Sequence, residues 1–228
     1  MVADGGREAE EPAGIEEDDS DYFDLVYGRG RRQRTADVLR DRMLVRMVAK
    51  HAPFRRHSGR PALIDVGCGH GYLLERFSAS YDVYGSDISE HAVEIAGRRP
   101  GVREVRRASA EEGLAFNLDF SVVLMVNVLE HLRGPARALA CMRERIARAG
   151  ICVVHLPTIN NRVNRIVYEA TYAKDRTHIF RRSGAEVRRL FESVGFTLRE
   201  ESYFPHRPRY VANLLKLYPP YVGVFGRR

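Results

Sequence analysis

The sequence has little cysteine and no long apolar segment. Its three cysteines, Cys68, Cys141 and Cys152, are odd in number and show no C-x-x-C spacing. This pattern argues against a disulfide framework or a structural zinc site, and it is expected of a protein in a reducing cytoplasm. No apolar run reaches the roughly 18 residues needed to cross a bilayer, so we expect no transmembrane segment. Because the first residues are acidic, we also expect no signal peptide.

Charge is distributed unevenly along the 228 residues. Residues 1–21 hold nine acidic residues and one arginine, so this segment carries a net charge of −8 while the whole chain carries +7. The remaining body, at +15, would favour nucleic acid, an anionic lipid or an acidic substrate as a partner. Its positive charge is mostly arginine scattered through the chain, so nucleic-acid binding is the less favoured hypothesis. The acidic segment has the composition of a disordered, solvating tail.

The chain divides into three expected parts. Residues 1–21 form the disordered tail, and residues 22–58 form an N-terminal helical segment whose apolar residues recur at helical spacing. Residues 59–228 form the main domain. Within it, residues 157–182 are too long for a simple connection and predict a substrate-covering insertion. Three aromatic residues of the second part are candidates either for a lid over a ligand or for ordinary helix packing: Tyr22, Phe23 and Tyr27.

Short apolar runs alternate with helical patterns throughout the main domain. The strands are expected at residues 62–66, 81–86, 102–107, 120–126, 151–156, 197–203 and 221–225. The helices are expected at residues 72–79, 89–98, 135–149 and 183–194. Repeated strand–helix units of this length predict an α/β fold, with a doubly wound, mostly parallel, seven-stranded sheet and helices on both faces.

The most informative segment is the glycine-rich turn at residues 67–71, between an apolar strand and a helix. Glycines permit positive φ and let a ligand approach the backbone, while the N–H groups of the following helix face that ligand. A dinucleotide fingerprint would place glycine or alanine where Tyr72 stands. Asp65 precedes the turn, where its carboxylate would repel a pyrophosphate and attract a cation. The turn therefore predicts a ligand with an ammonium or sulfonium group.

Asp87 ends the next expected strand, twenty residues after Gly67. A carboxylate at this strand end can accept hydrogen bonds from both hydroxyls of a ribose, as it does in dinucleotide-binding folds. The alternative is that Asp87 caps the helix that follows Ile88 and Ser89. Taken with the glycine turn, Asp87 favours a positively charged nucleoside ligand.

These segments resemble class I S-adenosylmethionine-dependent methyltransferases, in the group that includes the ubiquinone-biosynthesis methyltransferases (type 11/23). The resemblance implies a Rossmann-like domain, S-adenosyl-L-methionine as the cofactor and methyl transfer as the reaction. It rests on five segments that follow one another in the family's order: residues 64–71, 85–89, 108–111, 119–123 and 127–132.

The resemblance also implies which residues hold the cofactor. Asp65 and the turn glycines would hold its methionine part, and Asp87 would hold its ribose. The Ser109–Glu111 segment would reach the adenine, although many relatives have aspartate where Ser109 stands. The complete set of cofactor-contacting residues that we predict is Asp65, Gly67, Cys68, Gly69, Gly71, Tyr72, Asp87, Ile88, Ser109, Ala110, Glu111 and Asn127.

Glu130 and His131 follow the fourth strand, which places them at the carboxyl edge of the sheet, where open α/β sheets bind ligands. Methyl transfer needs an aligned acceptor, and it needs a base only where the acceptor must lose a proton. His131 is one candidate base. In similar methyltransferases an Asp-x-Thr-His segment recurs near the acceptor, which makes His178 in the insertion the second candidate. For Glu130 and for both histidines, the alternative is a role in capping a helix or orienting a loop.

Two further patterns narrow the chemistry. Some ubiquinone-type O-methyltransferases bind a divalent metal through a glutamate three residues before the Glu-His pair. That position is Asn127 here, so we predict no metal site. The Asn/Asp-Pro-Pro-aromatic tetrapeptide of methyltransferases that act on exocyclic amides and amines is absent after residues 120–126, which disfavours methylation of adenine or glutamine.

The expected function is transfer of a methyl group to a small molecule, or to a glycan or lipid intermediate, at an oxygen atom. An RNA or protein methyltransferase is one alternative, motivated by the +15 body. A non-catalytic protein that retains the cofactor pocket is the other. A nicotinamide-dependent oxidoreductase is the least favoured hypothesis because of Asp65 and Tyr72.

Overall fold

The computed structural model describes all residues except 1–34, 53–58, 174, 176, 204–215 and 217. The expected acidic tail and the three lid candidates Tyr22, Phe23 and Tyr27 therefore lie outside the described residues. The described part of the N-terminal segment is helix α2 (Thr35–His51), which precedes the sheet. No helix in the part of the chain that the structure covers is long and apolar enough to cross a membrane.

Seven strands form a single sheet in the order β3-β2-β1-β4-β5-β7-β6. All neighbours from β3 to β5 are parallel, whereas β7 runs antiparallel to both β5 and β6. The strand order reverses between β1 and β4, the place where sheets of this type bind ligands at the carboxyl ends of the strands. The strands are β1 (Ala62–Val66), β2 (Asp82–Asp87), β3 (Val102–Arg107), β4 (Phe120–Val126), β5 (Ile146–Pro157), β6 (Phe196–Ser202) and β7 (Pro220–Arg227).

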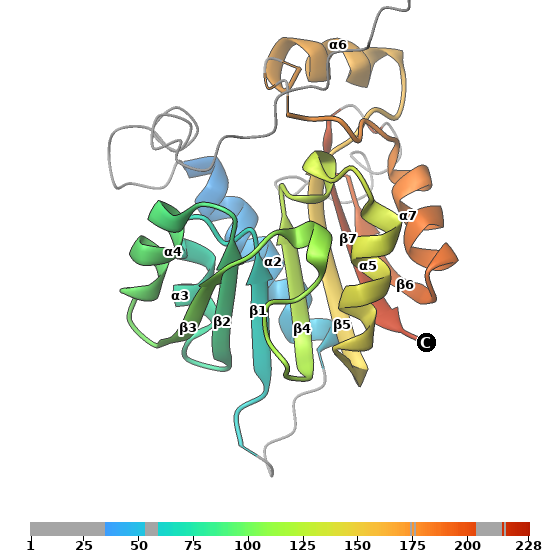
Figure 1. Ribbon diagram of the computed structural model, residues 1–228. Helices are drawn as coiled ribbons and strands as arrows, with labels where there is room; N and C mark the ends of the chain where they lie inside the picture. The colour runs from blue at the N-terminus through green and yellow to red at the C-terminus, as the bar shows by residue number, and fades with distance from the viewer. Residues whose placement is uncertain (1–34, 53–58, 174, 176, 204–215, 217) are drawn as a thin grey trace, which may run out of the picture.

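Helices cover both faces of this sheet, as expected from the sequence, and α6 lies beyond the ends of the strands (Figure 1). Helices α2 and α3 pack on one face, and α5 and α7 pack on the other. Two short 3₁₀ turns, η1 and η2, follow β3 and β4 and lead into the next elements. Their bounds, and those of the helices after α2, are α3 (Tyr72–Phe77), α4 (Glu90–Gly97), η1 (Ala110–Glu112), η2 (Leu129–His131), α5 (Pro135–Glu144), α6 (Arg162–Thr171) and α7 (Gly184–Ser193).

The centre of the sheet is buried on both faces. In β4, Val122 and Leu124 enter the apolar cluster beneath α2 and α3, whereas Val123 and Met125 enter the cluster beneath α5 and α7. All four side chains are fully buried. Because successive side chains of a strand point to opposite faces, an uninterrupted apolar run is what a central strand requires. Each such side chain contributes roughly 1.5–3 kcal/mol through its burial.

The expected end of the helix at residues 135–149 is wrong. Helix α5 ends at Glu144, and β5 begins at Ile146 rather than at residue 151. Ile146 is fully buried and pairs with Phe120, whose N–H donates to the carbonyl of Arg145 over 2.8 Å. Burial of Ile146 and pairing with β4 outweigh the helical pattern of the arginine- and alanine-rich segment around it.

Helix α7 begins with a capping box. The Ser183 hydroxyl accepts a hydrogen bond from the N–H of Glu186 (3.3 Å), and the Glu186 carboxylate accepts one from the N–H of Ser183 (2.9 Å). These two hydrogen bonds satisfy backbone N–H groups that the first turn of the helix leaves without partners.

We expect Ser183→Ala to lower the free energy of unfolding by about 1 kcal/mol, measured by urea denaturation. Ser193→Ala, at the other end of the same helix, is the matched control, because the exposed Ser193 hydroxyl only donates to the carbonyl of Leu190. An equal loss in the two variants would contradict the capping role of Ser183.

Candidate active site

The glycine-rich turn is held tightly between β1, β2 and β4. The N–H groups of Gly67 and Cys68 both donate to the carbonyl of Ser86, over 2.7 and 3.0 Å. Gly67 has φ of 69°, and a Cβ atom there would lie 2.3 Å from Cγ2 of Val128. Gly71 has φ of 74°, and its Cβ would lie 2.9 Å from that of Ala96. Close packing thus excludes a side chain at both positions, in addition to the positive φ.

Asp87 ties the end of β2 to this turn. One carboxylate oxygen accepts a hydrogen bond from the N–H of Gly69 (2.8 Å), and the other accepts one from the N–H of Ser89 (3.0 Å). Ser89, and not Asp87, caps helix α4, because its hydroxyl accepts a hydrogen bond from the N–H of Ala92. Next to Asp87, the Ile88 side chain is 45% exposed and offers apolar surface at the carboxyl edge of the sheet.

Asp65 is a buried carboxyl group with unmet hydrogen-bonding capacity. Its side chain is nearly inaccessible, and its Oδ1 atom has no hydrogen-bond partner among the described residues. Burial raises the pKa of Asp65 to about 8; the neighbouring Asp41 and Asp87 also raise it, while Arg40 opposes the shift. Three carboxyl groups therefore lie close enough to influence one another, an arrangement that a cationic ligand would stabilise.

Helix α2 contributes residues that the sequence analysis did not single out. Asp41 is fully buried, and it accepts hydrogen bonds from the guanidinium groups of Arg40 (2.9 Å) and Arg76 (3.2 Å). A sequence signal was present, because Asp41 is in helical phase with the buried Leu44 and Val48. A charged residue on the apolar face of a helix is a candidate for a role in a site.

The predicted adenine-contacting residues have local hydrogen bonds. The Ser109 hydroxyl accepts from the N–H of Glu111 (3.3 Å) and caps η1. The Glu111 carboxylate accepts from the N–H groups of Arg133 and Gly134, the latter over 3.1 Å, at the start of α5. These side chains thereby fix the segment around Ala110 against α5. Their contact with the adenine stays a prediction.

Two other predicted cofactor residues have structural contacts of their own. Cys68 is buried, and its Sγ lies 2.9 Å from where a Cβ of Gly85 would be. Burial, together with Asp65, raises the pKa of the Cys68 thiol well above 9.0, so it stays protonated. Asn127 has φ of 57°, and its amide oxygen lies 2.9 Å from Nδ1 of His155 on the neighbouring β5. Because the Cys68 side chain is packed against Gly85, we expect Cys68 to approach a ligand through its backbone.

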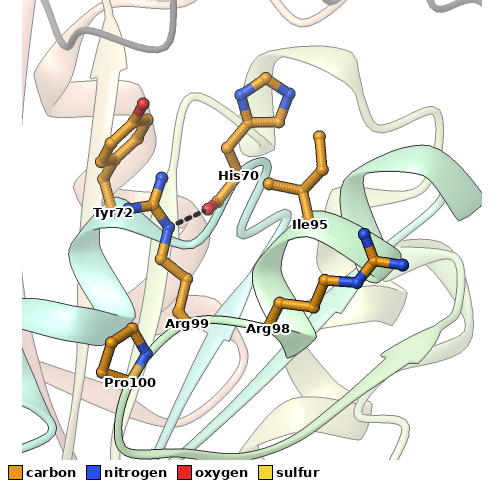
Figure 2. A pocket seen from close by; sticks show the side chains of 6 residues that line it. All are labelled: His70, Tyr72, Ile95, Arg98, Arg99 and Pro100. Carbon is orange, nitrogen blue, oxygen red and sulfur yellow. Dashed lines mark hydrogen bonds between the residues drawn. The ribbon is translucent and has the colours of Figure 1, made fainter.

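A pocket of about 540 Å³ lies on the α3–α4 side of the turn (Figure 2). Among the predicted cofactor residues, Tyr72 lines it, but neither Asp65 nor Asp87 does. Arg99 donates to the carbonyl of His70 (2.8 Å), and its guanidinium lies 3.8 Å from the centre of the Tyr72 ring. The ring of Tyr72 thus packs on this arginine and lines the pocket, and its contact with the cofactor stays a prediction.

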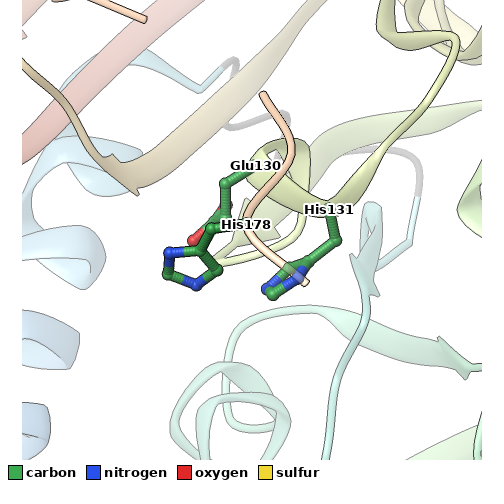
Figure 3. A group of neighbouring side chains, drawn as sticks. All are labelled: Glu130, His131 and His178. Carbon is green, nitrogen blue, oxygen red and sulfur yellow. The ribbon is translucent and has the colours of Figure 1, made fainter. Parts of the chain in front are cut away.

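The three predicted catalytic residues Glu130, His131 and His178 lie together (Figure 3). The imidazole centroids of His131 and His178 are 4.8 Å apart, although 46 residues separate His131 from Thr177, the neighbour of His178. The insertion is fixed to η2 by the N–H of Phe180, which donates to the carbonyl of Glu130 (2.9 Å). We call these three residues the edge cluster. Val128, which contacts Gly67, immediately precedes η2, so the edge cluster adjoins the glycine turn.

Hydrogen bonds orient His131 within the edge cluster. Its Nδ1 lies 3.2 Å from the carbonyl oxygen of Thr177 and 2.8 Å from the Thr177 hydroxyl. A carbonyl can only accept, and the Thr177 hydroxyl donates to the Asp175 carboxylate, so Nδ1 of His131 is the protonated nitrogen. This tautomer leaves the lone pair of Nε2 available to an acceptor group or a cation.

Burial sets the charge state of the edge cluster. It lowers the pKa of His131, and it lowers the pKa of His178 to about 4, with the neighbouring His131 adding to that second shift. Burial also raises the pKa of Glu130 to about 8, and neither carboxylate oxygen has a hydrogen-bond partner among the residues that the structure describes. At pH 7, both imidazoles are therefore neutral and Glu130 is mostly protonated.

The sheet order and the carboxylate-flanked turn define a Rossmann-like α/β domain. A family model described as a methyltransferase domain matches residues 29–201. The chain belongs to this family of methyltransferase domains. This confirms the family and the class of enzyme that the sequence segments predicted.

Curated relatives match part of the chain. The ubiquinone biosynthesis O-methyltransferase of Cereibacter sphaeroides (strain ATCC 17025) is 32% identical over 96 residues, which cover 40% of this chain and 39% of the relative. The tRNA U34 carboxymethyltransferase of Haemophilus influenzae is 28% identical over 143 residues, 59% of this chain and 44% of the relative. In each case the match spans less than half of the relative's length.

Solved structures share the fold across almost the whole chain. The magnesium protoporphyrin IX methyltransferase of Synechocystis with bound S-adenosylmethionine superposes with a TM-score of 0.61 at 17% identity, covering 91% of this chain and 90% of that chain. An S-adenosylmethionine-dependent methyltransferase from Clostridium acetobutylicum gives a TM-score of 0.65 at 8% identity, covering 90% and 96%. These similarities establish the fold alone.

The charge state of Asp65 predicts a pH dependence of cofactor binding. In the free protein Asp65 keeps its proton below about pH 8, whereas a bound cation favours the carboxylate, so that binding releases a proton. We expect the affinity for S-adenosylmethionine to fall by up to about tenfold per unit as the pH is lowered from about 7 to about 5.5. Calorimetry in buffers of different ionisation enthalpy measures both the affinity and the proton release.

Asp65→Asn is the matched control for this dependence. The variant is expected to bind the cofactor more weakly and to lack the proton release. Its melting temperature without cofactor should be no lower than that of the parent protein, because it removes a buried acid whose pKa is raised on folding. An affinity that stays constant over this pH range in the parent protein would rule out Asp65 as the partner of the cofactor's positive charge.

Proposed function

We propose that the protein transfers the methyl group of S-adenosylmethionine to a hydroxyl oxygen of a small molecule, or of a glycan or lipid intermediate. The observation that carries this proposal is the edge cluster, in which two neutral imidazoles adjoin the glycine turn. A neutral imidazole can accept the proton of a hydroxyl group, whereas an amine acceptor that is already deprotonated needs no such base. The position of the cluster next to the turn favours an acceptor held beside the methyl group.

The cofactor would lie along the carboxyl ends of β1 and β2. Asp65 would stabilise its positive charge, and Asp87, already oriented by Gly69 and Ser89, would accept hydrogen bonds from the ribose. Ile88 would provide an apolar surface for the nucleoside. The close packing of Gly67 and Gly71 supports this placement, since the turn is rigid before any ligand arrives.

The proposed transfer is an in-line displacement at the methyl carbon. The acceptor oxygen forms a bond to this carbon while the carbon–sulfur bond breaks, and S-adenosylhomocysteine leaves as a neutral thioether. Nε2 of His131 accepts the hydroxyl proton, because Nδ1 already donates to Thr177. His131 is a better base than His178, since the pKa of His178 is as low as about 4. His178 and Glu130 would position the acceptor.

The insertion at residues 157–182 would cover the acceptor. Helix α6 lies past the ends of the strands (Figure 1) and contacts His178 of the edge cluster through Tyr168. Its Tyr168 hydroxyl lies 3.3 Å from Nδ1 of His178, and the ring of Tyr172 stacks with that of His178 at 6.4 Å between centroids. An aromatic cover of this kind excludes water from the methyl group, which favours transfer to the acceptor over hydrolysis.

An RNA acceptor is the second candidate. It is supported by the +15 charge of the body and by the partial similarity to a tRNA-modifying enzyme of Haemophilus influenzae. The scattered arrangement of the arginines and the buried, aromatic surroundings of His178 favour a small acceptor group instead. Retention of RNA that declines steeply with salt would favour the RNA hypothesis.

The proposal is tested by cofactor binding and by turnover with a panel of acceptors. S-adenosylmethionine should bind in calorimetry, and Asp87→Ala should weaken binding by about tenfold or more, because it removes the ribose contact and unties Gly69. With phenolic and other hydroxylated acceptors, we expect S-adenosylhomocysteine and a methyl ether. His131→Ala should slow turnover by about 10²–10⁴-fold with little change in cofactor affinity.

Other outcomes distinguish the alternatives. Methylated RNA or protein as the sole product would replace the small-acceptor proposal. Cofactor binding without product across the panel, including no methylation of the protein itself, would support a binding protein. His131→Ala turnover equal to that of the parent enzyme would remove His131 from the mechanism.

A further inference from the structure

We infer that the edge cluster is a binding site for a divalent transition-metal ion, with His178 taking the place of the carboxylate that is missing at position 127. The sequence predicts no metal site because Asn127 stands at that position. The structure supplies a third ligand from a different part of the chain. Binding of the ion can be tested apart from the proposed function, whereas its use in methyl transfer rests on it. A bound ion would occupy Nε2 of His131, so His131 would then act as a ligand in place of the base proposed above.

The three side chains present a coherent set of donors. One atom from each of Glu130, His131 and His178 lies within 4.8 Å of the other two. Donors at about 2.0–2.2 Å from a zinc ion are separated by roughly 3.3 Å, so side-chain movements of the order of 1 Å complete the geometry. Two imidazoles and one carboxylate are the donors preferred by zinc, iron and manganese rather than by calcium.

Glu130 is the observation that points to a ligand. Its side chain is fully buried, and both carboxylate oxygens are without a hydrogen-bond partner in the described part of the chain. A buried carboxyl group without hydrogen-bond partners is costly even when it is protonated, and more so when it is charged. The neighbouring imidazoles of His131 and His178 cannot both serve, since two adjacent protonated imidazoles would repel each other. A single divalent ion satisfies the carboxylate and both rings together.

Both histidines also have the outer partners that metal-binding histidines require. Nδ1 of His131 donates to Thr177, which leaves Nε2 as the ligand atom. The two nitrogens of His178 lie near the Tyr168 hydroxyl (3.3 Å) and the Asp175 carboxylate (3.6 Å), so one nitrogen would exchange its contact for the ion while the other keeps its outer partner. A carboxylate, carbonyl or hydroxyl on the second nitrogen fixes the ring and raises its affinity for a metal.

Position 127 is occupied by a different interaction. The Asn127 amide oxygen lies 2.9 Å from Nδ1 of His155, which holds the ends of β4 and β5 together. His178 reaches the site because the insertion is fixed to η2 through Phe180 and Thr177. An ion in the edge cluster would thus join the insertion to η2. When bound, it would lower the pKa of a hydroxyl group coordinated to it, and His131 would serve as a ligand.

The test uses the full-length protein without a polyhistidine tag, first freed of metal by a chelator. Zn²⁺ is titrated in a calorimeter, and Co²⁺ is added separately to record its visible absorption. We expect one ion per chain and cobalt bands typical of nitrogen and oxygen ligands. Glu130→Gln, His131→Ala and His178→Ala should each weaken Zn²⁺ binding by about 100-fold or more.

Two controls make the ligand assignment specific. His91→Ala removes an exposed histidine on α4, and Asn127→Ala removes the side chain at the position used by relatives; both should keep the ion. A cooperative thermal unfolding transition reports that each variant is folded, and His178→Gln replaces His178→Ala if the latter does not fold. A folded, cofactor-binding parent protein that takes up no Zn²⁺ or Co²⁺ would overturn the inference. Loss of the ion in Asn127→Ala, but not in His178→Ala, would equally overturn it.

Discussion

The contact between Gly67 and Val128 is the constraint on which the arrangement of the site depends. With 2.3 Å between Cγ2 of Val128 and the position of a Gly67 Cβ, no other residue fits at the start of the turn. The contact joins the carboxyl ends of β1 and β4, where the strand order reverses. It therefore fixes the separation between the glycine turn and the edge cluster, which begins two residues after Val128. In the mechanism that we propose, methyl transfer depends on this separation, because its rate is governed by alignment of the acceptor.

The strands that build this arrangement could be predicted closely from the sequence. Residues 62–66 and 120–126 form β1 and β4 with the expected bounds, since these apolar runs end at Gly67 and Asn127. The end of α5 could not be predicted, because Ile146 fits the helical period as well as it fits a strand. Its assignment is decided by pairing with Phe120, a contact between residues far apart in the sequence. Local periodicity does not contain this information.

The positions of the site residues could be predicted where a sequence motif fixes the backbone. They could be predicted less well where contacts between distant elements determine the position of a side chain. Asp65, Gly67 and Asp87 lie around one turn, as their spacing implied. By contrast, the sequence could not show that Glu111 accepts hydrogen bonds at the start of α5, or that Asp41 and Arg40 act on the pKa of Asp65. Both depend on the packing of one element against another. The sequence suggested that His131 and His178 lie near each other only because each of them follows a strand. The carboxyl ends of those two strands lie at the same edge of the sheet.

Two buried acids define the electrostatics of this edge. Burial raises the pKa of Asp65 and of Glu130 to about 8, and each has at least one oxygen without a hydrogen-bond partner among the described residues. A protein that needed these groups only for stability would gain from apolar replacements, because a buried acid with unmet hydrogen bonds costs free energy. On our proposals the cost is recovered when a positive charge arrives: the cofactor's at Asp65 and a metal ion's at Glu130. The turn and the edge cluster would then be two cation-binding sites of similar design, held at a fixed separation by the packing of Val128 on Gly67.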